Sequence, residues 1–334
     1  MRRSLFVLTF AFYLLPFALP ARAQDGPPPP PPKPVVQQKD DGIETVRIDT
    51  DLVDLNVSVF SRDLKNQVSE LQQKDFAVME NGKAEEISFF ASAKTPFDLV
   101  LLIDLSGSTA DKLDLIRKSA IRFVEAARPV DRIGIVTFTD VPRIVSKLTT
   151  DRQELKERIK KIDKPVGGTN FWDALNFVLR GVLGAKSETR RQAVVVMTDG
   201  VDNALPDVPG PGSATSFDDL LELIKKSDAI VIPIYLDTER EEIKKHRAVQ
   251  SAYKLARQQL SEIAEESGSL LYNARKLEDL KGVYELVIRD LGMVYSIGYR
   301  PTNRERDGSW RNVVVRLVNH PELLARTRRG YYAK

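Results

Sequence analysis

The middle of the chain alternates between short apolar runs and segments with helical spacing. The run 97–103 is almost uninterrupted, which is typical of a parallel strand buried on both faces. Residues 113–127 carry apolar side chains every three or four positions and predict a helix. The alternation continues with strands expected at 133–138, 193–197, 230–236 and 270–273, and helices at 171–183, 216–226, 253–264 and 277–291. This pattern predicts an α/β fold, with a doubly wound, mostly parallel open sheet and helices on both faces (Rossmann-like).

The regions that flank this domain have the two-residue period of β-strands. Val53, Leu55 and Val57 alternate with polar residues, and Asn81-Gly82 between two apolar runs predicts a tight hairpin. Strands are also expected at 294–299 and 313–318. We expect the front and back strands to pair into one small antiparallel, β-sandwich-like module into which the α/β domain is inserted.

The first residues have the pattern of a secretory signal peptide. Basic residues at the start are followed by the apolar run 5–19 and by the small-x-small site Ala21-Arg22-Ala23. Pro16 interrupts this run, which is shorter than the roughly 20 residues of a membrane-spanning helix. We expect cleavage after Ala23, export by the general secretory route to the periplasm or the outside of the cell, and no membrane span in the mature chain. An uncleaved N-terminal anchor is the alternative.

A proline-rich segment follows, with consecutive prolines at 27–32 that favour an extended spacer without a core of its own. The expected organisation is therefore a signal peptide, a linker, the first part of the β module, the α/β domain and the C-terminal strands of the β module. Their expected bounds are 1–23, 24–43, 44–95, 96–291 and 292–334.

Charge at first favours a nucleic-acid partner, since the formal net charge is +3 and the pI is about 8.8. Arg2, Arg3 and Arg22 account for this excess, and all three lie in the expected signal peptide. Without them, 47 of the 50 basic residues remain against 47 acidic ones. The mature chain is then formally neutral, and nothing in its charge indicates a nucleic-acid partner.

The chain has no cysteine and only two histidines, His246 and His320. Disulfides, thiolate metal sites, a cysteine nucleophile and a histidine-rich metal cage are therefore excluded. His246 lies in a densely charged segment and His320 in an expected turn, so both are interpreted as surface residues. Oxygen is left as nearly the only metal-ligand chemistry available.

Oxygen-bearing side chains gather where the predicted strands end. Asp104, Ser106 and Ser108 follow the run 97–103, Asp199 follows the strand 193–197, and Thr169 lies in a Gly-Gly-Thr loop that starts a helix. Ligands bind open α/β sheets outside the carboxyl ends of the strands, so these segments should meet. Carboxylates and hydroxyls without nitrogen or sulfur suit a hard cation, Mg²⁺ first, with Mn²⁺ or Ca²⁺ as alternatives.

This set of residues resembles the metal-ion-dependent adhesion site (MIDAS) of von Willebrand factor A-type (VWFA) domains. The resemblance covers residues 96–291, and the layout is similar to VWFA-related proteins that bacteria export. It implies that Ser106, Ser108 and Thr169 ligate the metal directly or nearly so, and that Asp104 and Asp199 contact it directly or through water. It also implies a coordination position that an acidic group of a partner can complete.

We therefore expect an exported, non-enzymatic protein-binding or adhesion module without catalytic residues, whose protein partner presents Asp or Glu. A metal-dependent phosphoester hydrolase is one alternative. It is disfavoured because the phosphatase motif needs a second aspartate where this chain has Ser106. A serine hydrolase would need a G-x-S-x-G turn, which the sequence lacks. A structural envelope protein without cation-dependent binding is the other alternative.

Other polar or aromatic residues near these motifs are interpreted structurally. Asp202 is expected to be a loop acid, although it lies close to Asp199. Asp173 suits the first turn of its helix, where the helix dipole favours a carboxylate. Trp172 can line the site or pack beneath the loop. The basic cluster Arg326, Arg328 and Arg329 is expected to form a solvated edge strand.

Overall fold

A computed structural model of the chain describes residues 52–61, 70–107, 113–163, 167–184, 187, 189–245 and 249–334. The expected signal peptide and proline-rich linker, Ser108 and His246 lie outside these described residues. The predictions made for them therefore stay predictions.

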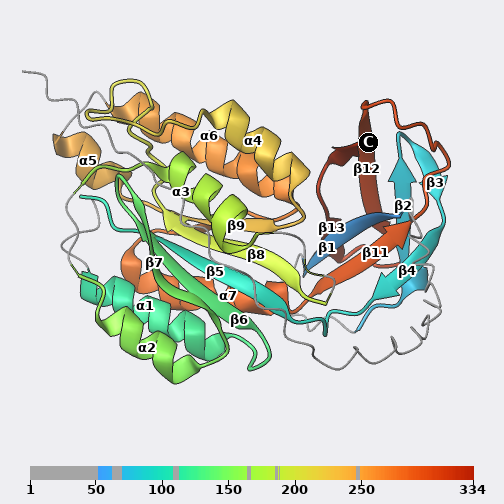
Figure 1. The fold of residues 1–334 in the computed structure, drawn as a ribbon, viewed down its shortest axis with the longest axis horizontal. Helices are drawn as coiled ribbons and strands as arrows, with labels where there is room; N and C mark the ends of the chain where they lie inside the picture. The colour runs from blue at the N-terminus through green and yellow to red at the C-terminus, as the bar shows by residue number, and fades with distance from the viewer. Residues whose placement is uncertain are drawn as a thin grey trace, which may run out of the picture. The chain divides into compact units, whose positions relative to one another are not determined.

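A six-stranded sheet lies at the centre of the α/β domain, in the order β10-β9-β8-β5-β6-β7 (Figure 1). Five strands are parallel: β5 (Phe97–Asp104), β6 (Arg132–Phe138), β8 (Arg191–Thr198), β9 (Ile230–Leu236) and β10 (Tyr272–Ala274). The edge strand β7 (Pro142–Thr149) is antiparallel to β6. The predicted open, mostly parallel sheet is confirmed.

Helices cover both faces of this sheet (Figure 1). One face carries α1 (Leu113–Ala126), α2 (Arg152–Lys160) and α7 (Leu280–Leu291), the last preceded by a 3-10 turn at Leu277–Asp279. The other face carries α3 (Phe171–Phe177), α4 (Phe217–Lys226) and α6 (Gln250–Ser267). A short helix, α5 (Glu239–Lys245), follows β9. Among the described residues, no helix is long and apolar enough to cross a membrane.

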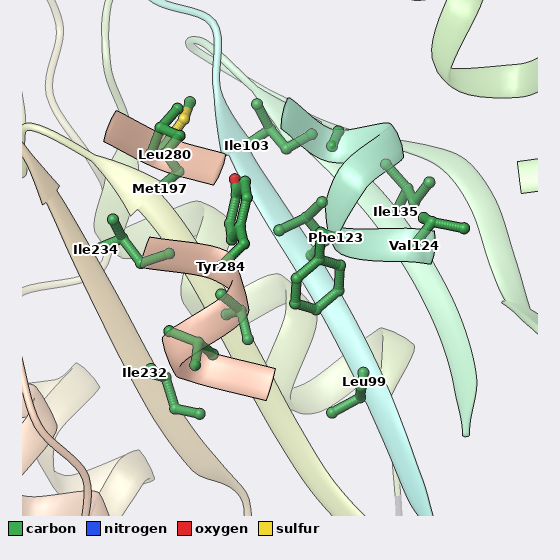
Figure 2. Packing of buried hydrophobic residues seen from close by; sticks show 14 of the residues in the cluster. Leu99, Ile103, Phe123, Val124, Ile135, Met197, Ile232, Ile234, Leu280 and Tyr284 are labelled. Atoms are coloured by element: carbon green, nitrogen blue, oxygen red, sulfur yellow. The ribbon is translucent and has the colours of Figure 1, made fainter. Parts of the chain in front are cut away.

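The pleat of β5 explains its uninterrupted apolar sequence. Leu99 and Ile103 pack on the α1 and α7 side, while Val100 packs on the side of α3, α4 and α6. Figure 2 shows Phe123 of α1 beside Tyr284 of α7 over this strand, and their ring centroids are 5.3 Å apart. Burying such side chains contributes roughly 1.5–3 kcal/mol each. Because both faces are buried, the central positions of the strand, 99–103, favour apolar residues.

Two local features differ from the predicted elements. The helix expected at 171–183 is α-helical only to Phe177, and a π-helical turn follows at Val178–Val182. In this turn the Leu183 N–H donates to the Val178 carbonyl, five residues back, at 3.0 Å. The second difference is that some elements were not predicted at all, among them β7, α2 and α5. The buried residues of α2 are Leu155 and Ile159 alone, so its apolar stripe is narrow.

The flanking segments form two antiparallel sheets. The first, in the order β13-β1-β11-β4, contains β1 (Val53–Ser61), β4 (Ile87–Ala91), β11 (Val294–Tyr299) and β13 (Leu323–Arg326). The second, in the order β14-β12-β2-β3, contains β2 (Phe76–Glu80), β3 (Lys83–Glu85), β12 (Trp310–Leu317) and β14 (Gly330–Tyr332), with a 3-10 turn (Gln73–Asp75) before β2.

These sheets share one apolar core, to which Leu55 of β1, Val78 of β2, Tyr295 of β11 and Val315 of β12 contribute. The antiparallel β module predicted from both flanks is thus confirmed. Each sheet combines strands from the front and the back of the chain, which explains why neither flank could bury its apolar face alone. The domain bounds given above stay predictions.

The basic cluster lies on edge strand β13 and in the segment after it, as predicted, and the Arg329 side chain is half-exposed, but the three side chains are not simply solvated. Arg328 donates to Asp228 at 3.0 Å, and Arg329 donates to Glu266 of α6 at 3.0 Å. Arg326 donates to the Ser269 carbonyl at 3.2 Å. The arginines instead connect the β module to the α/β domain, because acids of that domain lie opposite them.

Candidate metal centre

Asp104 ends strand β5 and is fully buried. The Ser106 N–H donates to Asp104 Oδ1 at 2.9 Å, and the Thr198 hydroxyl donates to Oδ2 at 2.6 Å. Asp104 lies in register with Phe138 of β6, and the preceding residue lies in register with Met197 of β8. The carboxyl ends of β5, β6 and β8 therefore lie at the same level of the sheet.

Asp199 follows β8 directly and is also buried. Its Oδ1 accepts the Val201 N–H at 3.1 Å. Its Oδ2 accepts the Thr238 hydroxyl at 2.8 Å and the Tyr253 hydroxyl at 3.3 Å. Thr238 and Tyr253 also lie within hydrogen-bond distance of each other, at 3.0 Å. Groups from the end of β9 and from α6 thus fix the orientation of this carboxylate.

The two carboxylates repel one another. Burial and then the charge of Asp199 raise the pKa of Asp104 to about 7, despite the hydrogen bonds from Thr198 and Ser106. Like charges that share a buried site disfavour ionisation of both groups. A divalent cation beside this pair would replace the proton and balance both charges. The electrostatics of the pair therefore fit a cation.

The Gly-Gly-Thr loop is attached to the same edge by hydrogen bonds from two directions. The Gly168 N–H donates to Asp140 Oδ1 at 2.7 Å, just beyond the end of β6. The Thr169 N–H donates to Asn203 Oδ1 at 3.1 Å, and the Asn203 N–H donates to the Thr169 carbonyl at 2.8 Å. These bonds place the Thr169 backbone against the segment that follows Asp199.

The glycines of this loop are required by the close approach of its neighbours. A Cβ on Gly168 would lie 2.1 Å from Asn203 Nδ2 and 2.8 Å from Asp140 Oδ1, both far inside contact distance. A Cβ on Gly167 would lie 2.5 Å from Asp140 Oδ2. Sequence reasoning missed Asp140 and Asn203 as positioning residues. Their one visible signal is a polar residue soon after a predicted strand end.

The neutral donors are hydroxyls. Ser106 and Thr169 are buried, and the Thr169 hydroxyl makes no hydrogen bond to any residue that the structure describes. The described residues hold no cluster of three or more His, Cys, Asp and Glu side chains that could bind a metal. The arrangement is a carboxylate pair with hydroxyls around it, which is the donor chemistry of a hard cation. Asp104, Ser106, Asp199 and the Thr169 loop meet at one edge.

The neighbouring acids have structural partners. Asp202 is buried and accepts three backbone N–H bonds together with the Ser213 hydroxyl, at 2.6–3.1 Å. Asp173 accepts two backbone N–H groups of residues 214–215 at 2.8 Å. Trp172 is buried and packs against Phe217, with ring centroids 5.8 Å apart. These contacts match the structural interpretation of all three residues.

A family model for the von Willebrand factor type A (VWA) domain matches residues 98–286, more than half of the chain. The chain belongs to the VWA domain family. VWA domains mediate protein–protein interactions, so family membership indicates an interaction module. A UPF0353 protein of Nocardia farcinica is 25% identical over 229 residues, which cover 64% of this chain and 66% of that relative.

Solved structures with a similar fold include the vWF domain of the type V pili tip protein Mfa5 from Porphyromonas gingivalis. Its TM-score is 0.43 at 14% identity, covering 60% of this chain and 96% of Mfa5. Proximal thread matrix protein 1 from the mussel byssus has a TM-score of 0.46 at 17% identity, covering 64% and 50%. A second structure of that mussel protein, with a zinc-occupied MIDAS motif, has a TM-score of 0.42 at 15% identity. The match covers 59% of this chain and 48% of the mussel protein. This chain thus spans about half the length of the mussel protein. The family assignment rests on the match to the VWA family model.

Proposed function

We propose that this chain is an exported, non-enzymatic interaction module that holds a divalent cation and engages an acidic side chain of a protein partner. The observation that carries the proposal is the carboxylate pair of Asp104 and Asp199. Both acids are buried at neighbouring strand ends, and the charge of one raises the pKa of the other.

Such a pair is costly unless a positive charge accompanies it. Moving an ionised group out of water costs roughly several kcal/mol, even after the protein has relaxed around it. A bound divalent cation offsets this cost and the mutual repulsion at once. Its binding therefore stabilises the folded chain by mass action.

Five residues would hold the cation: Asp104, Ser106, Ser108, Thr169 and Asp199. Two carboxylates balance the charge of Mg²⁺, and the hydroxyls add neutral oxygen ligands. Mn²⁺ and Ca²⁺ accept the same donors and are the alternatives. The bound ion would present positive charge to a carboxylate of the partner. Asp140 and Asn203 would hold the Thr169 loop in position.

The partner would approach the carboxyl edge of the sheet with an exposed Asp or Glu. Affinity for the partner would then depend on the cation. The proposed setting is the periplasm or the outside of the cell, because residues 1–23 have the pattern of a signal peptide.

Thermal unfolding with EDTA or with added Mg²⁺ tests the proposal. EDTA should lower the Tm and Mg²⁺ should restore it, since a ligand at 100 times its Kd stabilises by about 2.7 kcal/mol. Asp104→Ala should abolish the response. Asp218→Ala is the matched control, because this acid is exposed in the first turn of α4.

If Asp104→Ala responds to Mg²⁺ as strongly as the parent chain does, the site assignment is wrong. A generic phosphoester substrate completes the test. The proposal expects no metal-dependent turnover, whereas turnover lost in Asp104→Asn would replace it with a hydrolase.

A further inference from the structure

A groove of about 550 Å³ lies beside the candidate metal centre, along edge strand β7. Its floor includes Leu105 and Phe138, and residues 161–163 after α2 form part of its wall. Leu105 directly precedes the candidate ligand Ser106, and its N–H donates to the Phe138 carbonyl at 3.0 Å. The groove is therefore continuous with the edge that carries the proposed site.

The apolar surface of the groove reaches solvent. Leu105, Phe138 and Ile162 are buried in the floor, whereas Val141 and Ile144 on the rim are 60% and 46% exposed. Single exposed apolar side chains are ordinary, but here two of them border one concave surface with an apolar floor. The groove is thus suited to an apolar side chain.

The rim of the groove is predominantly basic. Arg143, Arg158 and Lys161 line it, against the single lining acid Asp163. Arg158 pairs with Glu154 at 2.8 Å. Arg143 and Lys161 form no ion pair or side-chain hydrogen bond with any described residue. Apart from the attraction between Lys161 and Glu157, no described acid neutralises them, so they can attract an acidic ligand.

We infer that this groove receives the same partner segment whose acidic side chain reaches the metal. The occupant is an extended peptide segment of another protein. One acid meets the cation, an apolar side chain enters between Val141 and Ile144, and a second acid meets Arg143 and Lys161. Charge complementarity and continuity with the site support this occupant, and the inference rests on the proposed function.

A random dodecapeptide display library tests the inference on the full exported chain. Selection is carried out in Mg²⁺, and bound peptides are eluted with EDTA. The eluted pool should be enriched in sequences that carry two acids flanking an apolar residue. An enriched peptide is then synthesised with a fluorophore, and its Kd is measured by anisotropy.

The double variant Arg143→Glu/Lys161→Glu should bind this peptide at least tenfold more weakly, while its Kd for Mg²⁺ by calorimetry stays unchanged. Lys118→Glu/Lys147→Glu is the matched control. It makes the same charge change at exposed positions that do not line the groove. A peptide whose second acid is replaced by lysine should recover affinity for the Arg143→Glu/Lys161→Glu chain.

The two proposals fail in different ways. If the parent chain gives no heat with Mg²⁺, the proposed function is overturned. If Mg²⁺ binds but the selected peptides bind parent and groove variant equally, the groove inference alone is overturned. Loss of self-association in the groove variant, without an effect on peptides, would assign the groove to a second copy and would also overturn it.

Discussion

Strand β5 carries a buried aspartate at each end, and the two ends differ in their electrostatics. Asp98 near the amino end is 3% exposed, and Asp104 at the carboxyl end is 0% exposed. Residue type, strand and burial are therefore nearly the same. The difference arises from the groups that neighbouring strands and loops place beside each acid.

Asp98 is neutralised by the chain itself. Arg132 Nε donates to it at 2.7 Å and Arg190 Nε at 2.6 Å. Burial alone would raise the pKa of Asp98, but these hydrogen bonds and charges outweigh it and lower the pKa. The acid is part of a structural network that needs no ligand.

At Asp104 the strongest charge effect comes from another acid, Asp199, and it raises the pKa. The hydrogen bonds to these carboxylates orient them without removing their repulsion. One end of the strand is thus built as a closed ion-pair network, whereas the other fits a positively charged ligand. The following variants separate these two roles, in order of expected effect.

The largest effect is expected at Asp98. Asp98→Asn leaves two guanidinium groups without their shared carboxylate and should lower the free energy of unfolding by about 3 kcal/mol. Urea unfolding should give the same loss with EDTA and with Mg²⁺. Asp114→Asn is the control, because this acid is 84% exposed in its pair with Arg117 and should cost under about 1 kcal/mol. If the loss of stability in Asp98→Asn depends on Mg²⁺, Asp98 is not part of a purely structural network.

In the metal-free chain, Asp104→Asn should raise the free energy of unfolding, whereas Asp98→Asn lowers it. Removing one of two repelling charges should raise its stability at pH 8 by roughly 1–2 kcal/mol. The variant should also lose the stabilisation by Mg²⁺, which is about 2.7 kcal/mol at 100 times the Kd. Calorimetric melts with EDTA and with Mg²⁺ measure both effects. Destabilisation of the metal-free variant at pH 8 would show that the pair is a structural network like that of Asp98.

The pH dependence of the metal-free chain should follow the raised pKa of Asp104. The folded state retains a proton that the unfolded state has released, so this contribution is complete below about pH 4 and is lost as the pH rises through about 7. Unfolding free energies at pH 5 and pH 8, compared with Asp104→Asn, should differ by roughly 2–3 kcal/mol. Saturating Mg²⁺ should remove most of this difference. If the free energy of unfolding depends on pH in the same way in the parent chain and in Asp104→Asn, the pKa of Asp104 is not raised.

The smallest effect is expected in the loop. Gly168→Ala forces its new methyl group against Asn203 and Asp140 and should weaken Mg²⁺ binding about tenfold, or about 1.4 kcal/mol. Gly282→Ala in α7 is the control, because its methyl group meets no described atom within 4 Å. Calorimetric titration with Mg²⁺ distinguishes them. Equal affinity in both variants would show that the loop does not position a ligand.

Sequence alone predicted the parallel strands β5, β6, β8 and β9 because each is a largely apolar run buried on both faces. It did not predict β7, an edge strand that begins at Pro142 and has two irregularities in its register with β6. An edge strand with a mixed burial pattern lacks a clean period of either two or 3.6. The α2 helix escaped prediction for a similar reason, since most of its residues are charged.

At the site, the sequence placed Asp104 and Asp199 at strand ends because strand ends are local features. It could not predict Asp140 or Asn203, whose roles depend on contacts with a loop about 30 residues away in the chain. The ion pair of Arg328 with Asp228 spans 100 residues and was missed for the same reason. Partners across such distances are determined by the packed fold.

Anomalous diffraction from crystals of the full chain soaked in Mn²⁺ would locate the cation directly. We expect an anomalous peak at the carboxyl edge of the sheet, ligated by Ser106, Ser108 and Thr169 with Asp104 and Asp199 in direct or water-mediated contact. In Asp104→Asn crystals this peak should be absent. A Mn²⁺ peak elsewhere in the parent chain, or none at this edge at saturating Mn²⁺, would show that the carboxylate pair does not hold a cation.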